Sequence, residues 1–198
     1  MKLILVTSPN YFVEEDKIVT ALFEEGLDIL HLYKNDTAPI YAERLLTLLP
    51  DQYLKRIVAH ENFYLKEEYK LKGVHINTPN PVAPPHYKGH LSCSCHTLEE
   101  VKAQKKNSDY IFFDNIPLEG QPSDYTEEDI RKAHKSGIID KRVIACGNIN
   151  EDNLKLMKEY GFGGVAIREA LWDKFDTCLD RDFDQVIEHF KKLKKLID

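Results

Sequence analysis

The fold is decided by two stretches near the end of the chain, Asp140-Lys-Arg-Val-Ile-Ala-Cys-Gly-Asn-Ile149 and Gly163-Gly-Val-Ala-Ile-Arg-Glu-Ala-Leu171. Each begins with an apolar run, continues into a turn and then starts a helical segment. A buried strand that leads into a helix is the repeating unit of parallel α/β proteins. Two such units side by side bring backbone N–H groups to adjacent strand ends, where they can bind a phosphate.

The same pattern extends over the whole chain. Eight apolar runs alternate with helical or loop segments, at residues 2–7, 29–34, 56–60, 73–77, 91–96, 110–115, 142–147 and 164–168. This alternation predicts parallel strands with right-handed crossovers. No glycine-rich dinucleotide-binding turn follows the first run, which continues as Ser8-Pro-Asn-Tyr11. We therefore predict a small single-domain (β/α)8 TIM barrel over residues 1–198 rather than an open doubly wound sheet.

Helix signals support these units. Thr97-Leu-Glu-Glu100 has the pattern of a capping box, Asn150 is the expected cap of the next-to-last helix, and Gly161 is expected to end it. The segment 78–89 contains too many prolines for a regular helix. The last helix should face the sheet with an apolar stripe, formed by Phe183, Val186, Ile187, Phe190 and Leu193.

Composition limits the classes of partner. The 198 residues are 42% hydrophobic and 30% charged, with a net charge of -6. This acidic balance argues against nucleic acid or an anionic membrane as the main partner. No apolar run is long enough for a signal peptide or a membrane span. We expect a cytoplasmic protein whose cysteines are mainly free, buried thiols; Cys93 and Cys95 should share one face of a strand.

Polar residues mark the end of the second predicted strand, Ile29-Leu-His-Leu-Tyr-Lys34. Alternation sends Leu30 and Leu32 toward the helices, which leaves His31, Tyr33 and the following Asn35 pointing inward and upward. Hydrogen-bonded core side chains are the alternative interpretation, because barrel interiors do bury polar groups.

The next strands repeat this feature, and the repetition favours a binding pocket. Polar pairs follow or end four further runs: His60 with Asn62, His75 with Asn77, Ser94 with His96, and Asp114 with Asn115. The carboxyl ends of the strands carry the active site in barrels of this kind. We predict that Tyr33, Asn35, Asn62, His75, Ser94, His96 and Asn115 contact a substrate.

Histidines are the expected proton carriers, since they titrate near neutral pH. His31 and His60 are the predicted catalytic residues, and His75 has the alternative role of filling the core. No pair of these histidines has the H-x-H or H-x-x-x-H spacing of a metal site on one element, so no metal ligand is predicted. Glu61 and Asp114 are the acids expected at the first six strand ends, too few to predict a magnesium site.

With the strand ends laid out, the chain resembles the thiamine phosphate synthase/TenI family of (β/α)8 barrels over essentially its whole length. The similar pieces, in order, are Asp28-Ile-Leu-His-Leu32, Gly73-Val-His-Ile76, Ser94-Cys-His-Thr-Leu-Glu-Glu100, Asp109-Tyr-Ile-Phe-Phe113, Val143-Ile-Ala-Cys-Gly147 and Gly164-Val-Ala-Ile167. The resemblance implies one of two activities. The synthase joins a pyrimidine methyl diphosphate to a thiazole phosphate and releases diphosphate with the help of magnesium, whereas the TenI branch aromatises a thiazole phosphate tautomer by proton transfer.

Several family positions differ in this chain. The synthase pattern Q-x-R-x-K becomes His31-Leu-Tyr-Lys-Asn35, which removes two cations expected to bind diphosphate. The pattern N-D-R becomes His60-Glu-Asn62, and the Gln and Asp after G-V-H are replaced around Thr78-Pro-Asn80. The loop G-P-I-F-P-T becomes Asp114-Asn-Ile-Pro-Leu-Glu-Gly120, where a TenI-type catalytic histidine would fall near Asn115. Magnesium is therefore expected only if the chain works as a synthase.

The phosphate-binding part of the resemblance is better preserved. Gly147 stands at the first glycine of the family's G-G pair and Asn148 at the second, while Ile167 and Arg168 precede the next helix start. These four residues are the predicted phosphate-binding set. Glu169 replaces a usual serine, so Arg168 is either a phosphate clamp or the partner of an acid such as Glu169.

The sequence thus predicts a thiamine phosphate synthase/TenI-like protein that binds a small phosphorylated metabolite at the carboxyl-end mouth. Full synthase activity is not expected, because charge that would stabilise a departing diphosphate has been lost. A non-catalytic binding or regulatory protein and another phosphate-binding barrel isomerase remain the alternatives, and a homodimer is left open.

Overall fold

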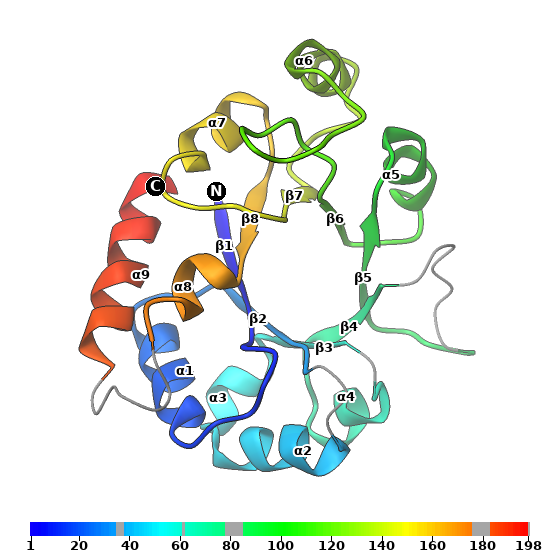
Figure 1. Ribbon diagram of the computed structural model, residues 1–198. Helices are drawn as coiled ribbons and strands as arrows, with labels where there is room; N and C mark the ends of the chain where they lie inside the picture. Colours follow the sequence, from blue (N-terminus) through cyan, green and yellow to red (C-terminus); the bar gives the residue numbers. More distant parts are fainter. Residues whose placement is uncertain (35–37, 61, 78–84, 176–182, 198) are drawn as a thin grey trace.

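Eight parallel strands close into a barrel in the computed structural model, with β8 pairing back onto β1 (Figure 1). The structure describes residues 1–197 except 35–37, 61, 78–84 and 176–182. The strands are β1 Lys2–Val6, β2 Ile29–Leu32, β3 Ile57–His60, β4 Gly73–Ile76, β5 His90–Cys95, β6 Tyr110–Phe113, β7 Val143–Ala145 and β8 Gly164–Ile167. The predicted (β/α)8 TIM barrel is confirmed.

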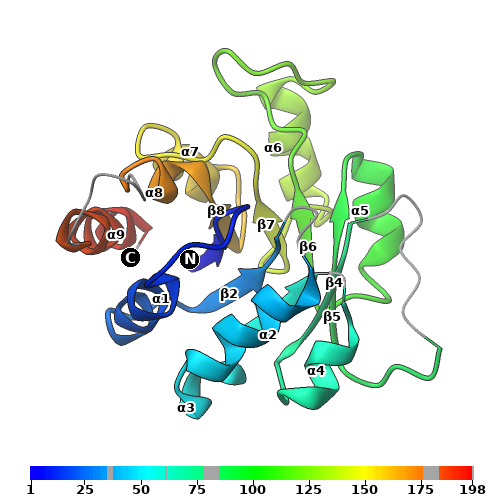
Figure 2. The same cartoon turned by 60° about the horizontal axis from the view of Figure 1, so that its bottom comes forward.

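Helices surround the barrel and follow the strands along the chain (Figure 2). They are α1 Glu15–Glu24, α2 Pro39–Leu48, α3 Asp51–Leu54, α4 Tyr64–Glu68, α5 Leu98–Gln104, α6 Glu127–Lys135, α7 Leu154–Glu159, α8 Glu169–Trp172 and α9 Asp184–Ile197. Between β4 and β5 the described residues form no helix, as the prolines predict. None of the helices in the described ranges has the length and apolar character needed to cross a membrane.

The helix signals are confirmed with one correction. Thr97 accepts the backbone N–H of Glu100, whose side chain accepts the N–H of Thr97, so the capping box is present. Gly161, with φ of +82°, lies just beyond the end of α7. The prediction for Asn150 is wrong: α7 starts later, at Leu154, because Asn150 and Asn153 use their side chains in a preceding turn.

Two apolar layers result from the alternation along the strands. Leu30 and Leu32 belong to the outer layer, which packs beneath the helices together with the buried stripe of α9. Cys93 and Cys95 lie in the same layer as free, buried thiols, as predicted. The smaller inner layer fills the barrel and consists of Ile4, Ile29, Val58, Tyr110, Phe112, Ile144 and Ala166.

Candidate active site at the carboxyl end of the barrel

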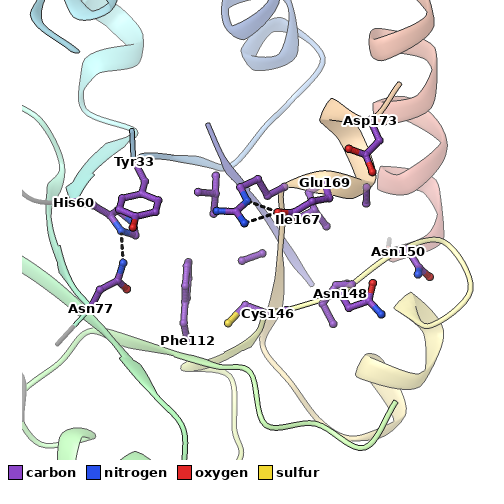
Figure 3. Close-up of a pocket in the computed structure, with 16 residues that line it drawn as sticks. Tyr33, His60, Asn77, Phe112, Cys146, Asn148, Asn150, Ile167, Glu169 and Asp173 are labelled. Carbon is purple, nitrogen blue, oxygen red and sulfur yellow. Dashed lines mark hydrogen bonds and ion pairs between the residues drawn. The ribbon is translucent and has the colours of Figure 1, made fainter. Parts of the chain in front are cut away.

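A cavity of about 330 Å³ lies above the inner layer, at the carboxyl ends of the strands (Figure 3). It is lined by Val6, Tyr33, His60, Asn77, Phe112, Cys146, Gly147, Asn148, Ile149, Asn150, Ala166, Ile167, Arg168, Glu169, Ala170 and Asp173. Six of the predicted site residues are in this set: Tyr33, His60, Gly147, Asn148, Ile167 and Arg168. In Figure 3, Tyr33, His60 and Asn77 face Asn148, Asn150 and Asp173 across the cavity.

The turn after β7 forms one wall. Gly147 has φ of +77° and Asn148 has φ of +46°, a left-handed pair in which glycine avoids the clash that a side chain would cause. The backbone N–H groups of Gly147, Asn148 and Ile149 donate no hydrogen bond to any residue that the structure describes. The turn therefore offers donors beside the cavity.

The segment after β8 forms the facing wall. Arg168 donates from Nε to Glu169 Oε1 at 2.6 Å, and its terminal nitrogen also contacts that oxygen. The side chains are 36% and 60% exposed, respectively, so solvent weakens this ion pair and a competing anion can displace it. Asp173 adds a second carboxylate to the wall. Of the two roles predicted for Arg168, the structure shows the pairing with Glu169.

His60 forms part of the cavity floor and connects it to the barrel interior. Asn77 Nδ2 donates to His60 Nδ1 at 3.1 Å. An amide nitrogen only donates, so neutral His60 carries its proton on Nε2. That nitrogen lies 2.7 Å from His31 Nδ1, and His31 Nε2 in turn lies 2.5 Å from the Tyr110 hydroxyl. The result is a directed chain of hydrogen bonds from the cavity to Tyr110.

His75 occupies the next strand, where it joins the same network. Its Nδ1 lies 2.8 Å from Ser92 Oγ, and its Nε2 lies 3.0 Å from Ser94 Oγ and 3.1 Å from Asn77 Oδ1. Ser94 also donates to Asn77 Oδ1 at 2.8 Å. The predicted residues His31, His75 and Ser94 therefore lie next to the cavity lining and support His60 and Asn77, without lining the cavity themselves.

Burial keeps these imidazoles neutral. The pKa values of His31 and His60 lie well below the usual range because both rings are removed from water, and His60 adds to the effect on His31. Burial likewise lowers the pKa of His75 to about 3. At neutral pH all three rings are therefore uncharged.

The remaining predicted residues lie outside the cavity lining. His96 Nδ1 contacts Asp114 Oδ1 at 2.8 Å, with a His96 side chain that is 59% exposed. Asn115 donates to the His96 carbonyl and to Asp124, which fixes the loop after β6. Asn62 lines a separate small hollow with Lys34 and Ala38. Asn35 lies outside the described residues.

Sequence reasoning omitted several lining residues from the predicted site. Asn77 is two positions after His75, so strand alternation could have assigned it to the same face. The same alternation applies to Val6, Phe112 and Ala166, whose apolar side chains carry no chemical signal. Glu169 and Asp173 come from α8 and its end, and only the packing of that short helix brings them to the mouth.

A buried ion pair holds the loop after β1 at the mouth. Lys34 Nζ lies 2.5 and 2.6 Å from the two carboxylate oxygens of Glu15, and it also donates to the carbonyls of Ser8 and Asn10. Desolvation raises the pKa of Glu15 to about 7 and outweighs the attraction of Lys34. Burial also lowers the pKa of Lys34.

Within the described residues, no three carboxylates converge on one point. Magnesium prefers carboxylate, carbonyl and water oxygens. Within the described ranges, the only converging group of three potential metal ligands is His31, His60 and His75, which supplies nitrogen. Of the carboxylates in the cavity wall, Glu169 is already paired with Arg168. Glu61 and the segment Thr78–Asn80, where the family has acids, lie outside the described residues.

Comparison with known proteins agrees with the resemblance. The crystal structure of a thiamine phosphate pyrophosphorylase from Bacteroides thetaiotaomicron is 59% identical in sequence, with a TM-score of 0.92, and covers 99% of this chain and 97% of that one. A thiamine phosphate pyrophosphorylase from Pyrococcus furiosus has a TM-score of 0.73 at 20% identity over 99% of this chain and 95% of that one, which shows the shared fold.

Curated relatives are more distant. The thiamine-phosphate synthase of Actinobacillus succinogenes is 26% identical over 131 residues, which are 61% of this chain and 59% of that protein. The corresponding enzyme of Limosilactobacillus reuteri is 24% identical over 150 residues, 71% of this chain and 65% of that protein. The matched region thus spans less than two thirds of either relative, and no model of a known protein family matches the chain. On the near-complete match at 59% identity, the chain belongs to the thiamine phosphate synthase family.

Proposed function

We propose that this protein binds a phosphorylated thiazole, or a similarly small phosphate, in the cavity at the carboxyl end of the barrel. The observation that carries this proposal is the pair of cavity walls. The turn at Gly147–Ile149 presents backbone N–H groups that are free within the described residues, and Arg168 supplies a cation opposite them. Backbone N–H groups and an arginine are the donors that proteins use for phosphate.

Binding requires Arg168 to change partner. In the structure its charge is neutralised by Glu169. A phosphate that reaches the wall would compete with Glu169 for the guanidinium of Arg168. The Glu169 carboxylate, once displaced from Arg168, would repel the phosphate. The affinity for phosphate is therefore lower than it would be with an uncharged residue at position 169.

Diphosphate displacement is poorly supported by the same residues. A departing diphosphate needs several positive groups in place as its charge develops. Arg168 is the only lysine or arginine among the described residues that line the cavity. Lys34, just after the end of β2, does not line it and is engaged by Glu15. We infer little or no synthase turnover, which leaves thiazole phosphate binding, with or without proton transfer, as the activity.

Proton transfer would fall to His60, with His31 behind it. His60 is the one imidazole of the described cavity lining, and its neutral Nδ1 can act as a base if a ligand replaces Asn77. The fact that every ring nitrogen of His31 and His60 already has a partner favours the second candidate, a protein that binds without turnover.

Calorimetry with thiazole phosphate and with its unphosphorylated alcohol tests the binding proposal. We expect binding of the phosphate form only. Arg168→Gln should weaken it and Glu169→Gln should strengthen it, whereas Glu99→Gln on the exposed face of α5 is the matched control and should change nothing. Equal affinity for the two compounds, or equal effects of all three substitutions, contradicts the assignment of the cavity.

A second assay separates the activities. Purified protein is incubated with pyrimidine methyl diphosphate, thiazole phosphate and magnesium, and separately with the thiazole phosphate tautomer. Aromatisation that falls in His60→Gln and His31→Gln, at unchanged ligand affinity, would support proton transfer. Binding without either reaction would support the non-catalytic role. Robust formation of thiamine phosphate would contradict the inferred loss of synthase activity.

A further inference from the structure

Three histidines from consecutive strands converge inside the barrel. One ring nitrogen from each of His31, His60 and His75 lies within 4.8 Å of those of the other two. Their ring centroids are 4.3 to 5.0 Å apart. Three imidazolium ions would repel one another at this separation, but neutral imidazoles can share the space, and neutral imidazole is the form that binds metals.

The nitrogens that face away from the cluster are also arranged as in a metal site. Histidine ligands usually bond through their second nitrogen to a neighbouring group, which orients the ring. When His31 uses Nδ1 and His60 uses Nε2, the outer nitrogens are those next to Tyr110 and Asn77. His75 has a partner on either side, with Ser92 at Nδ1 and Ser94 at Nε2.

We propose that His31, His60 and His75 form a binding site for a divalent transition-metal ion such as Zn²⁺ at the floor of the cavity. Three imidazole nitrogens match the preference of zinc, copper, nickel and iron, whereas magnesium and calcium require oxygen. The site lies outside the predictions made from sequence, since the three histidines are too far apart in the chain to form a spacing motif.

The cluster must rearrange to accept the ion, because the rings of His60 and His75 are stacked at an interplanar angle of 21° and one of them has to rotate before both lone pairs can face one ion. His31 Nδ1 and His60 Nε2 are 2.7 Å apart, as a hydrogen bond requires. Two nitrogens bound to one tetrahedral zinc ion lie about 3.3 Å apart, because each Zn–N distance is about 2.0–2.1 Å. The ring of His60 borders the cavity and therefore has space on one side for this shift.

Proton positions change with binding. His60 Nε2 carries a proton in the hydrogen-bonded network, so that proton must leave or move to Nδ1 when the ion binds. Asn77 must then turn its amide so that oxygen faces His60 Nδ1. Binding therefore replaces the His31–His60 hydrogen bond by two bonds to one ion, and His75 supplies the third bond by giving up its hydrogen bond to Ser92 or to Ser94.

Three neutral ligands leave the charge of the ion uncompensated. An anion in the cavity, such as hydroxide or a phosphate, would complete the coordination sphere. The proposal goes beyond the proposed function and does not depend on it, because the metal ligands lie below the phosphate-binding walls.

Metal binding to the intact protein is the direct test. Protein stripped with a chelator is titrated with Zn²⁺ and with Co²⁺, and stoichiometry, affinity and the visible absorption of Co²⁺ are recorded. We expect one ion per chain and a Co²⁺ spectrum typical of nitrogen coordination. His75→Gln and His60→Gln should each lose at least about 100-fold in affinity, since even outer-shell changes cost about 10–100-fold.

Two variants separate ligation from general disturbance. His86→Gln changes an exposed histidine outside the cluster and should bind as wild type does. Tyr110→Phe removes the outer partner of His31 and should weaken binding about 10–100-fold at unchanged stoichiometry. If the histidine variants do not fold, the Co²⁺ spectrum of the wild type and a metal-dependent rise in its Tm still show whether the cluster binds an ion. Absence of binding at micromolar metal, or equal affinity in wild type and a folded His75→Gln, overturns the proposal.

Discussion

The barrel interior has a polar side and an apolar side that are equally buried. On β2 to β4 the inward residues include His31, His60 and His75, whereas β1, β7 and β8 contribute Ile4, Ile144 and Ala166. Both His31 and Ile144 are 0% exposed. Apolar contacts are non-directional and tolerate small changes, but a buried polar group is stable only when its hydrogen-bond partners are present. The polar side is therefore held as a network, in which each residue depends on the others.

The largest loss of stability should come from breaking the buried ion pair between Lys34 and Glu15 at the mouth of the barrel. Lys34→Met leaves the Glu15 carboxyl buried without its cation, and we expect a loss of about 3–5 kcal/mol in the free energy of unfolding. The double variant Lys34→Met/Glu15→Gln should lose less than the sum of the single variants. Urea denaturation measures both. Lys17→Met, which breaks the exposed pair with Glu14, is the control and should have little effect; equal losses at Lys17 and Lys34 would contradict the comparison.

A substitution in the histidine hydrogen-bond network should lower the free energy of unfolding more than a substitution in the apolar inner layer. His31→Leu leaves His60 Nε2 and the Tyr110 hydroxyl without their partner, at about 1–3 kcal/mol for each unpaired group. Ile144→Val, at the same burial, should cost about 0.5–1.5 kcal/mol. Chemical denaturation of both variants in chelator tests the difference. Comparable losses of stability in the two variants would mean that residues on the polar side depend on one another no more than residues on the apolar side do.

The polar side should also make stability depend on pH. Because burial lowers the pKa of His75 to about 3, against about 6.5 in the unfolded chain, the unfolded state binds more protons between these values. The stability is thus present above pH 6.5 and is lost as pH falls through this window, by at most about 1.4 kcal/mol per pH unit for each histidine. Denaturation of metal-free protein at several pH values measures the slope. His75→Gln should reduce that slope, and an unchanged slope would show that His75 does not titrate in this way.

The smallest effect is expected outside the barrel, where neither side of the interior is involved. Thr97→Ala removes the cap of α5 and should cost about 1 kcal/mol. Thr47→Ala provides the comparison, since its hydroxyl bonds to a carbonyl within α2 and caps no helix. If Thr97→Ala lowers the free energy of unfolding as much as His31→Leu does, the buried polar network contributes no more to stability than an exposed helix cap.

Much of the fold follows from local patterns. Short apolar runs, glycine turns and helix caps are each readable within a few residues, and together they predict the eight strands and their order. The prediction of Asn150 as the cap of α7 is wrong because the side chains of Asn150 and Asn153 both bond within the preceding turn, and α7 begins without a side-chain cap.

The candidate site was only partly predictable. Alternation correctly places His31 and Tyr33 on an inward face, where His31 contacts Phe112 and Tyr110 of the inner layer and Tyr33 lines the cavity, as Gly147 does. The role of Arg168 depended on which acid came near it, and the structure brings Glu169 to its guanidinium. His96 and Asn115, predicted from the repeated polar strand ends to contact a substrate, bond to Asp114 and Asp124 in the loop after β6 and do not line the cavity.

The sequence by itself determined the parallel barrel, the end of the barrel that carries polar groups, and the glycine turn after the seventh strand, since each is indicated by residues close together in the chain. Only the tertiary structure decided which histidines meet. Strand register pairs His60 with His75 and places His31 beside Val58, one level deeper. That stagger comes from closure of the whole barrel, a property shared by all eight strands and encoded in none of them alone.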